Sequence, residues 1–328
     1  MQKAREGAGR RWHPRRCRAA AAAARSWRAL HHRRQRRRLS RRRGARRRSG
    51  AAQARVKGAC DTHFHVFGPA DRYPARDPKL RYKPPFAPLE EYLVWAEKRG
   101  FGRFVFVQPS AYARDNSCML DAMRAIGHPC RGIVDVDEDA PERLLAEMHE
   151  AGVRGVRVNV SPVHPPEAGL AERLTPRIDR LEARCAELGW QLDFLLPGWL
   201  TEAMLSRLAK LKVDFTLAHM GMFLAKDGPQ QPGFPGMIDM LKSSRGYAKL
   251  TGVYRMSTTR GFGDAKPMAQ ALIGEVPDRV IWGSDFPHLS FADQVDSDQL
   301  LALLTEWAPD EGVRRKMLVE NPARLFGF

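Results

Sequence analysis

Eight short apolar segments alternate with eight amphipathic segments between residue 59 and the end of the chain. This alternation restricts the fold to architectures in which each strand is followed by a helix that covers it. We expect strands over residues 59–66, 104–108, 132–136, 155–159, 191–196, 214–219, 247–251 and 280–284. Helices are expected over 88–100, 116–127, 141–152, 172–188, 201–211, 234–245, 266–275 and 297–307.

The apolar segments are rich in Val, Phe, Leu and Ile, and most lack the polar alternation of a half-exposed strand. Such continuous runs indicate a parallel sheet covered by helices. An open, doubly wound sheet would show the same alternation, but it usually has a Gly-rich phosphate turn after its first strand. Here the first strand ends in His63-Phe64-His65. We therefore predict an α/β fold of the (β/α)8 TIM-barrel type over residues 59–328, a usual size for that fold.

Residues 1–58 form a strongly basic segment with 22 Lys and Arg residues and one acidic residue, Glu6. Such a stretch cannot bury enough apolar surface to offset the entropy of ordering, so we expect a disordered tail. An inert tail, or a gene-model artefact with the true start near Val56, is the leading interpretation. A transit-like segment and a nucleic-acid-binding arm are the alternatives. Residues 59–328 carry a net charge of −3, which argues against nucleic acid as a partner of the body.

Cysteine usage and hydropathy favour a cytoplasmic protein. The five cysteines have no paired spacing, which is typical of reduced thiols and not of a disulfide framework. No apolar run is long enough to span a bilayer, so we expect no membrane partner. The oligomeric state, including a homo-oligomer, stays open.

Histidine and aspartate residues occur at the carboxyl ends of three expected strands. His63 and His65 close the first strand, His219 closes the sixth, and Asp285 follows the eighth. Residues two apart in a strand point to the same side, so both imidazoles of the first strand should face the barrel mouth. A single histidine is more often a surface or core residue, but the carboxyl ends of all barrel strands meet at one mouth. We therefore predict that these four residues form a catalytic centre.

The motifs around these residues resemble those of amidohydrolase family 2, most of all its pyrone-dicarboxylate and sugar-acid lactonases. The matching stretches are CDTHFHVF at 60–67, RGVRVN at 154–159, HMG at 219–221, WGSDFPH at 282–288 and NPARLF at 321–326. The resemblance implies an amidohydrolase-superfamily barrel that hydrolyses a lactone, a cyclic carboxylic ester. It implies that Asp285 is the general base for water, and that His63, His65 and His219 polarise the carbonyl group and stabilise the oxyanion.

Two arginines and four other polar residues are candidate substrate contacts. Arg157 ends the fourth strand and Arg255 follows the seventh. A guanidinium group pairs with a carboxylate in a bidentate fork, so we predict that both arginines hold an anionic substrate. A salt bridge at the barrel rim is the alternative for each. The further candidates for hydrogen bonds to the substrate are Ser110, His288, Asn159 and Tyr82, whereas Tyr254 could be a packing residue.

The metal content of the site can also be predicted. A catalytic zinc ion usually has three protein ligands, and His63, His65 and Asp285 could supply them for a single Zn or Mn ion. However, the fourth strand offers Arg157 where a two-metal site would need a bridging carboxylate or modified lysine, and its charge would repel a nearby cation. The resembled pyrone lactonases work without metal. We therefore expect that no cofactor is required.

The chain departs from the resembled lactonases at several positions. Ala218 and Met222 stand where Asp and Arg flank the His-Met-Gly motif, and Pro162 and Val163 lie where a further arginine is expected. A leucine or phenylalanine replaces a tyrosine late in the fifth strand. Losing such charged contacts would disfavour a dicarboxylate, so we predict a mono-carboxylated or neutral lactone as substrate. A metal-dependent decarboxylase or hydratase and a lactone isomerase are the alternatives.

Overall fold

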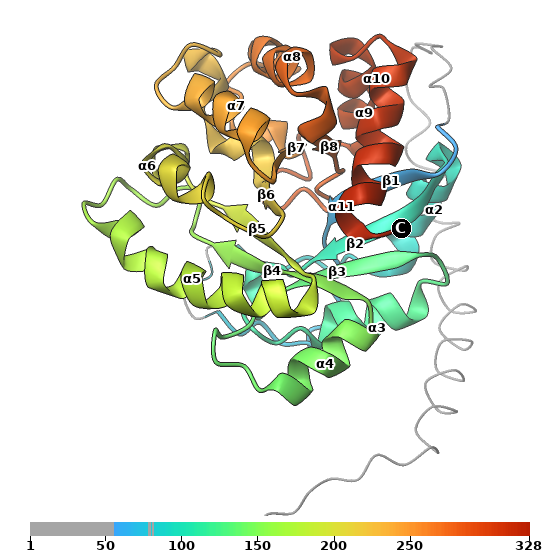
Figure 1. The fold of residues 1–328 in the computed structure, drawn as a ribbon. Coiled ribbons are helices and arrows are strands. Elements are labelled where there is room, and N and C mark those ends of the chain that lie inside the picture. Colours follow the sequence, from blue (N-terminus) through green and yellow to red (C-terminus); the bar gives the residue numbers. More distant parts are fainter. Residues whose placement is uncertain (1–55, 78–79, 81) are drawn as a thin grey trace, which may run out of the picture. The chain divides into compact units, whose positions relative to one another are not determined.

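The computed structural model describes residues 56–77, 80 and 82–328, and the strands in this part of the chain form one parallel sheet (Figure 1). The order of strands in the sheet follows the order of the chain, from β1 to β8. The strands are β1 (Ala59–Phe64), β2 (Phe101–Val107), β3 (Cys130–Val134), β4 (Val153–Asn159), β5 (Gln191–Leu195), β6 (Phe215–Leu217), β7 (Gly246–Leu250) and β8 (Val280–Trp282). The predicted (β/α)8 architecture is confirmed.

Backbone hydrogen bonds between β1 and the segment after β8 close the sheet into a barrel. The N–H of Asp285 donates to the carbonyl oxygen of His63 at 2.8 Å, and the N–H of His65 donates to that of Phe286 at 2.8 Å. These bonds lie at the carboxyl end of both strands. The closure therefore brings the two histidines of the first strand next to Asp285.

Helices cover the outside of the barrel (Figure 1). They are α2 (Leu89–Arg99), α3 (Ser117–Ala125), α4 (Glu142–Glu150), α5 (Leu170–Leu188), α6 (Gly198–Leu208), α7 (Phe234–Ser243), α8 (Lys266–Glu275), α9 (Ser297–Trp307), α10 (Glu311–Arg315) and α11 (Asn321–Phe326), with a π-helical turn at Lys316–Glu320. Each longer helix buries one apolar stripe against the strands, as Ile178, Leu181 and Cys185 do on α5. The expected helices are present, and α10 and α11 are additional to them.

The C-terminal segment closes the amino-terminal end of the barrel. The side-chain amide of Asn321 donates to the carbonyl oxygen of Val280, the first residue of β8, at 2.8 Å. Phe326 is 2% exposed and packs with Ile133 and Ile281 in the barrel interior. The carboxyl end of the barrel is therefore the end at which a site can form.

Every strand except β4 ends one or two residues earlier than the sequence predicts, and the backbone of β6 and β8 shows why. β6 stops at Leu217 because His219 and Met220 adopt left-handed backbone conformations, with φ of 52° and 49°. β8 stops at Trp282, and Asp285 has φ of 54°. Non-glycine residues rarely adopt this conformation, and apolar periodicity does not reveal it. Both strand ends turn sharply just where the predicted catalytic residues lie.

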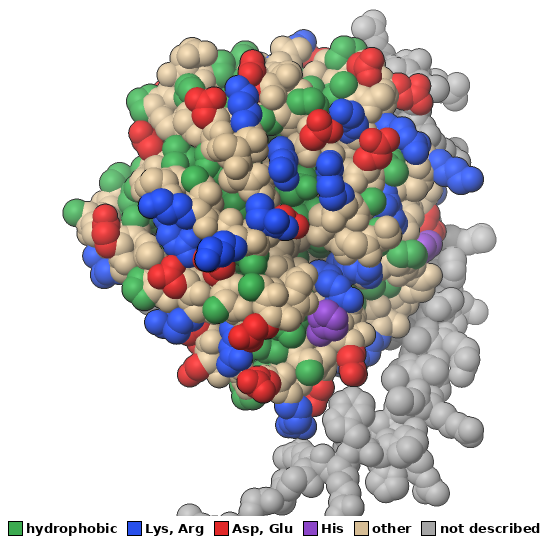
Figure 2. All heavy atoms as spheres, in the orientation of Figure 1, with side chains coloured by type: hydrophobic (Ala, Val, Ile, Leu, Met, Phe, Trp, Pro, Cys, Tyr) green, Lys and Arg blue, Asp and Glu red, His purple; other side chains and the backbone are tan. Residues whose placement is uncertain are grey.

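The remaining expectations concern membrane association, surface charge and the basic N-terminal tail. Among the described residues, no helix is long and apolar enough to cross a membrane. Figure 2 shows Lys and Arg side chains interspersed with Asp and Glu over the visible face, with no large surface of one charge. The predicted tail lies outside the described residues except for 56–58. Its disorder, the domain boundary at residue 58 and the nucleic-acid-binding arm remain predictions.

Candidate active site

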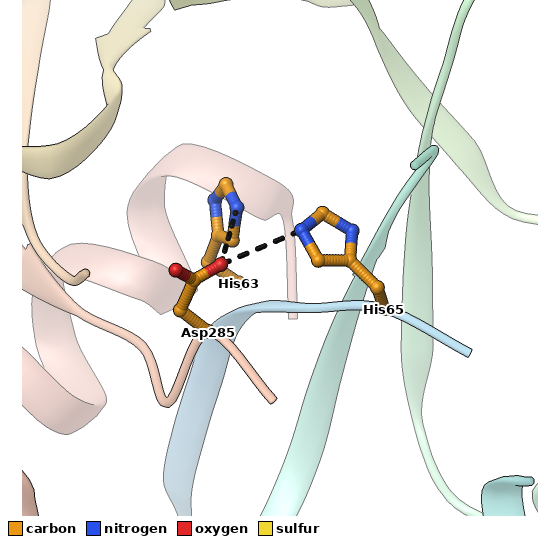
Figure 3. Close-up of side chains that lie close together, drawn as sticks. All are labelled: His63, His65 and Asp285. Carbon is orange, nitrogen blue, oxygen red and sulfur yellow. Dashed lines mark ion pairs between the residues drawn. The ribbon is translucent and has the colours of Figure 1, made fainter. Parts of the chain in front are cut away.

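Four buried residues converge at the carboxyl end of the barrel. His63 lies in β1 and His65 just after it, whereas His219 follows β6 and Asp285 follows β8. The Nε2 atoms of His63 and His65 lie 3.6 and 3.4 Å from Oδ1 of Asp285, and Nε2 of His219 lies 3.9 Å from Oδ2. Figure 3 shows His63 and His65 directed at the same carboxylate. The structure thus places together the four residues that the sequence singles out.

The turn after β6 holds His219 in its place. Its backbone N–H donates to Oγ1 of Thr251 at 3.2 Å, and its Nδ1 lies 2.7 Å from the same hydroxyl. The backbone of Gly252 lies against the His219 ring, and a Cβ atom at position 252 would lie 2.4 Å from Nδ1 of His219. Glycine is required at this position because its φ of 54° and this close approach both exclude a side chain. The end of β7 therefore fixes the histidine that follows β6.

Burial keeps the three imidazole rings neutral. Removal from water lowers the pKa of His65, lowers the pKa of His219 to about 3, and lowers the pKa of His63 well below its usual value. Nδ1 of His65 lies 2.7 Å from the carbonyl oxygen of Val107, which can only accept a hydrogen bond. Nδ1 therefore carries the proton, and the lone pair on Nε2 of His65 faces Asp285.

The Asp285 carboxylate is ionised although it is buried. Burial by itself would raise its pKa, but the positive charge of Arg255 outweighs burial and holds the pKa well below its usual value. Nε of Arg255 donates to Oδ2 at 3.1 Å, and the hydroxyl of Tyr254 donates to the same oxygen at 2.6 Å. Oδ1 has no hydrogen-bond partner. One oxygen of Asp285 is thus occupied and the other is open.

A buried ion pair lies next to His63. Lys249 of β7 pairs with Asp193 of β5, both with no exposed surface, and the hydroxyl of Thr216 donates to Asp193 at 2.7 Å. Nζ of Lys249 also lies 3.3 Å from Nδ1 of His63. An ammonium group can only donate, so His63 accepts at Nδ1 and carries its own proton on Nε2, toward Asp285. Three strands therefore set the orientation and the tautomer of His63.

His63, His65 and Asp285 form a candidate site for one divalent cation, since their ligand atoms lie within 4.8 Å of one another. Nε2 of His63 and Oδ1 of Asp285 are buried, and neither has a hydrogen-bond partner among the described residues. Ligands of a tetrahedral ion with bonds of about 2.0–2.1 Å lie about 3.4 Å apart, close to the observed separations of 3.4 and 3.6 Å. The bond from His65 to Val107 orients its Nε2 as a metal ligand requires. The donor set fits one ion, whose binding would release the Nε2 proton of His63.

A cavity of about 1120 Å³ opens beside these residues. His65, His219 and Asp285 are among the residues that line it. Predicted substrate contacts that also line it are Arg157, Arg255, Ser110, Asn159 and Tyr82. His288 does not line the cavity, because its ring is turned to Ser297, with Nε2 lying 3.0 Å from that hydroxyl. The cavity lining thus gives no support to a substrate contact of His288, which stays a prediction.

The two arginines of the cavity lie near the carboxylate of Asp285. Arg157 is 4% exposed, donates to the carbonyl oxygen of Gln108 at 2.6 Å, and lies 3.9 Å from the carboxylate of Asp193. The side chain of Arg255 is 19% exposed and is paired with Asp285. Neither ion pair is an exposed salt bridge at the rim, because both carboxylates are buried.

The smaller polar residues of the cavity have few partners of their own. The hydroxyl groups of Tyr82 and Ser110 lie 3.3 Å apart. Oδ1 of Asn159 is buried and has no hydrogen-bond partner. An unpaired polar atom on a cavity wall is costly unless water or a ligand satisfies it. Asn159 is thus suited to contact a ligand.

Sequence reasoning missed four residues that support the centre. The sequence leaves open that Tyr254 only packs, yet its hydroxyl group donates to Asp285. Lys249 and Asp193 lie within predicted strands, and a charge inside an apolar run was a signal that could have found them. Asp61, which precedes His63 by two residues, accepts from the hydroxyl of Tyr92 at 2.6 Å, and burial raises its pKa to about 6.

The closed barrel and the histidine–aspartate centre at the carboxyl ends of its strands define a (β/α)8-barrel enzyme. The sequence profile of the amidohydrolase family matches residues 60–328, and the chain belongs to this family. The prediction of an amidohydrolase barrel is therefore confirmed.

Relatives with known names share most of the chain. The 4-sulfomuconolactone hydrolase of Hydrogenophaga intermedia is 36% identical over 274 residues, which cover 82% of this chain and 89% of the relative. The 2-pyrone-4,6-dicarboxylate hydrolase of Comamonas testosteroni is 30% identical over 285 residues, covering 82% and 90%. The crystal structure of a protein from Pseudomonas putida, described as a 2-pyrone-4,6-dicarboxylic acid hydrolase, superimposes with a TM-score of 0.70 at 28% identity, covering 83% and 98%.

Proposed function

We propose that this protein hydrolyses a lactone that carries one carboxylate or none. The observation that carries the proposal is the buried carboxylate of Asp285, which lines a cavity and lies 3.4–3.9 Å from the Nε2 atoms of three buried histidines. The names of the relatives, a sulfomuconolactone hydrolase and a pyrone-dicarboxylate hydrolase, support the same type of bond as substrate.

Asp285 acts as general base in this proposal. Its Oδ1 takes a proton from water, because Tyr254 and Arg255 already occupy Oδ2. The water oxygen bonds to the lactone carbonyl carbon, and the ring C–O bond then breaks. Asp285 returns the proton to the leaving ring oxygen, which yields a hydroxy acid. The low pKa of Asp285 keeps it ionised at neutral pH, as a base must be.

The histidines stabilise the charge that develops on the carbonyl oxygen. The Nε2–H of His63 points toward the centre because Lys249 donates to its other nitrogen. When the hydroxyl of Thr251 donates to Nδ1 of His219, that ring also carries its proton on Nε2 and presents it to the cavity. Donors fixed in place before the reaction stabilise an oxyanion without reorganising.

A divalent cation held by His63, His65 and Asp285 would supply Lewis acidity toward the lactone carbonyl. We propose that the site holds at most one ion, because Arg157 of β4 stands where a second ion would need a carboxylate. A bound ion would occupy Oδ1 of Asp285, so the proton transfers assigned to that oxygen are those of the metal-free site, as the expectation that no metal is required demands.

The substrate carboxylate is assigned to the two arginines. Arg157 and Arg255 line the same cavity as Asp285, and their guanidinium groups match a carboxylate in geometry and charge. Arg255 is shared with Asp285, so it can hold the substrate and the base in one arrangement. Ser110, Asn159 and Tyr82 add hydrogen bonds from the cavity wall.

The three-ligand set favours a second candidate, a metal-dependent decarboxylase or hydratase. That reaction needs a tightly bound ion and would leave lactones unopened. Isomerisation of a lactone ring is a further variant that the products distinguish, because the ring is retained.

The test measures metal content and ring opening for sugar-acid lactones and pyrone carboxylates, with the wild type and with Asp285→Asn. We expect ring opening by the wild type and a loss of about 10²–10⁴-fold in kcat for Asp285→Asn, the usual contribution of a general base. An unchanged melting temperature will show that the variant is folded. Stoichiometric metal without any lactone turnover would overturn lactone hydrolysis and support the decarboxylase or hydratase.

A further inference from the structure

We propose that the lactone taken by this site is charged at one end and carries an apolar alkyl or aryl group at the other. This inference rests on the proposed lactone hydrolysis and names the class of ring substituent. It follows from three features of the cavity: an apolar wall, an apolar mouth and two positive side chains that lie together near Asp285.

One wall of the cavity is apolar. It includes Leu195 of β5, Trp199 of α6 and the pair Met222 and Phe223 after β6. Trp199 is held in position by its Nε1–H, which donates to the carbonyl oxygen of His164 at 3.0 Å. A carboxylate or hydroxyl group placed against this wall would lose its water without gaining a partner. An alkyl or aryl group gains van der Waals contact with this wall and loses no hydrogen bonds to water.

The apolar surface continues to the mouth. Val163 and Leu224 both line the cavity and are 65% and 43% exposed. In the part of the chain that the structure describes, only five large apolar side chains are 39% exposed or more, and two of them line this cavity. Apolar side chains that gather at one exposed place mark a binding surface, whereas single ones are common and carry no meaning.

The two positive side chains of the cavity lie together near Asp285, and the other carboxylates that line it are Asp77, Glu202 and Asp227. Arg157 and Arg255 are the only Lys or Arg residues among the described residues that line it, and both lie near Asp285. Glu202 and Asp227 also line the cavity, and both are exposed to solvent. One anionic group of a substrate can therefore pair with an arginine. A second anionic group at the outer end would meet carboxylates and no cation.

The size of the cavity agrees with a substituted ring. Its volume of about 1120 Å³ exceeds the range of about 300–1,000 Å³ that is usual for small-molecule sites. A single five- or six-membered lactone with one carboxylate fills a small part of it, next to Asp285 and the arginines. The apolar wall would then stay in contact with water unless the substrate extends to it.

The experiment compares three lactones with the wild-type full chain. They are a γ-butyrolactone carboxylate and the same ring with either a phenyl group or a second carboxylate on the neighbouring carbon. We expect kcat/KM for the phenyl lactone to exceed that of the parent by at least about tenfold, the scale on which apolar pockets discriminate. The dicarboxylate should fall below the parent. A dicarboxylate turned over as well as the phenyl lactone overturns the inference.

A matched pair of leucine substitutions tests whether the preference for the phenyl lactone arises at the mouth of the cavity. Leu224 lines the cavity and is 43% exposed, whereas Leu144 of α4 is 39% exposed and is not among the lining residues. We expect Leu224→Ala to lower the preference for phenyl over parent by about threefold to tenfold. Leu144→Ala should leave that preference as it is. Equal effects of the two substitutions would contradict the assignment of the substituent to this mouth.

Binding separates this inference from the proposed function. Cyclic ketones with a CH₂ group in place of the ring oxygen cannot be hydrolysed, and calorimetry gives their affinities for the wild type. Tighter binding of the phenyl ketone than of the dicarboxylate ketone supports the inference, whether or not the protein opens a lactone. A failure to open any lactone would overturn the proposed hydrolase function and leave the inference about the ring substituent standing. Tighter or equal binding of the dicarboxylate ketone overturns the inference even if lactones are opened.

Discussion

The two oxygens of Asp285 have different surroundings, and the difference assigns them different roles. Oδ2 accepts hydrogen bonds from Tyr254 at 2.6 Å and from Arg255 at 3.1 Å. Oδ1 faces His63 and His65 and has no hydrogen-bond partner. An oxygen that already accepts two strong hydrogen bonds is a poor acceptor for a further proton. Oδ1 is thus the oxygen that takes a proton or binds a cation.

Tyr254→Phe tests the positioning of Asp285, because Tyr254 contacts the carboxylate and does not line the cavity. Losing a hydrogen bond to the ionised carboxylate raises the Asp285 pKa. A base is active above its pKa and loses activity as pH falls through it, so the acidic limb of kcat/KM should move to higher pH. A hydrogen bond to a charged group contributes roughly 1.5–3 kcal/mol, so we expect kcat to fall by at least about tenfold. Rate profiles from pH 8 down to the lowest pH at which both proteins stay folded measure both effects.

Tyr82→Phe is the matched control for this substitution. Its hydroxyl lies 3.3 Å from Ser110 on the cavity wall and makes no described contact with Asp285. We expect this variant to change KM and to leave the acidic limb where it is. An acidic limb that stays unmoved in Tyr254→Phe would show that Tyr254 only packs.

The sequence predicts the four residues that meet at the barrel mouth better than it predicts the residues that orient them. His63, His65, His219 and Asp285 could be predicted because all of them follow or end strands, and such ends meet in a barrel. The partnership of Lys249 with His63 could not be predicted. It depends on which strands face one another across the barrel, and apolar periodicity holds no such information.

At the scale of elements, the turns after β6 and β7 depend on one another. His219 after β6 has φ of 52°, and Gly252 after β7 has φ of 54°. A Cβ atom on Gly252 would lie 2.4 Å from Nδ1 and 2.9 Å from Cγ of His219. The two strand ends can therefore adopt this arrangement only with glycine at 252.

Gly252→Ala should disturb His219 and destabilise the protein. The left-handed conformation costs an L-residue roughly 1–2 kcal/mol, and the contact with the imidazole adds to that cost. We expect a loss of more than about 2 kcal/mol in the free energy of unfolding and at least a tenfold loss of kcat. Denaturant unfolding measures the first effect, and ring-opening kinetics measure the second.

Gly261→Ala separates the backbone cost from the contact. Gly261 has φ of 80°, and a Cβ atom there would meet nothing within 4 Å. This variant should lose only the roughly 1–2 kcal/mol of the left-handed conformation, with kcat unchanged. If the two alanine variants had the same kcat, the contact of Gly252 with His219 would be irrelevant to the site.

The sequence predicts the order of strands and helices but not all of their ends. Continuous apolar runs and glycine caps locate the eight strands and the helices between them. The early ends of β6 and β8 escape prediction because residues with large side chains adopt positive φ there. α11 escapes prediction because a short helix such as Asn321–Phe326 has too few turns to show a period.

At the scale of the whole molecule, the contacts that close the barrel all lie within residues 59–328. Phe326 packs into its amino-terminal end, and the hydrogen bond from Asp285 to His63 joins the first and last strands. Both closures use residues within 59–328, the same part of the chain that the amidohydrolase profile matches from residue 60. The barrel should therefore fold without the basic segment that precedes it.

We accordingly expect a chain of residues 56–328 to match the full chain in melting temperature and in kcat/KM for a lactone substrate. Of the 55 Lys and Arg residues in the full chain, 22 lie in residues 1–58, whereas residues 59–328 are slightly acidic. Any affinity of the full chain for duplex DNA should thus fall steeply with salt and vanish on truncation. Thermal unfolding, kinetics and a DNA-binding titration at two salt concentrations check this. A truncated chain that melts at a clearly lower temperature would place part of residues 1–55 in the fold and contradict the predicted boundary.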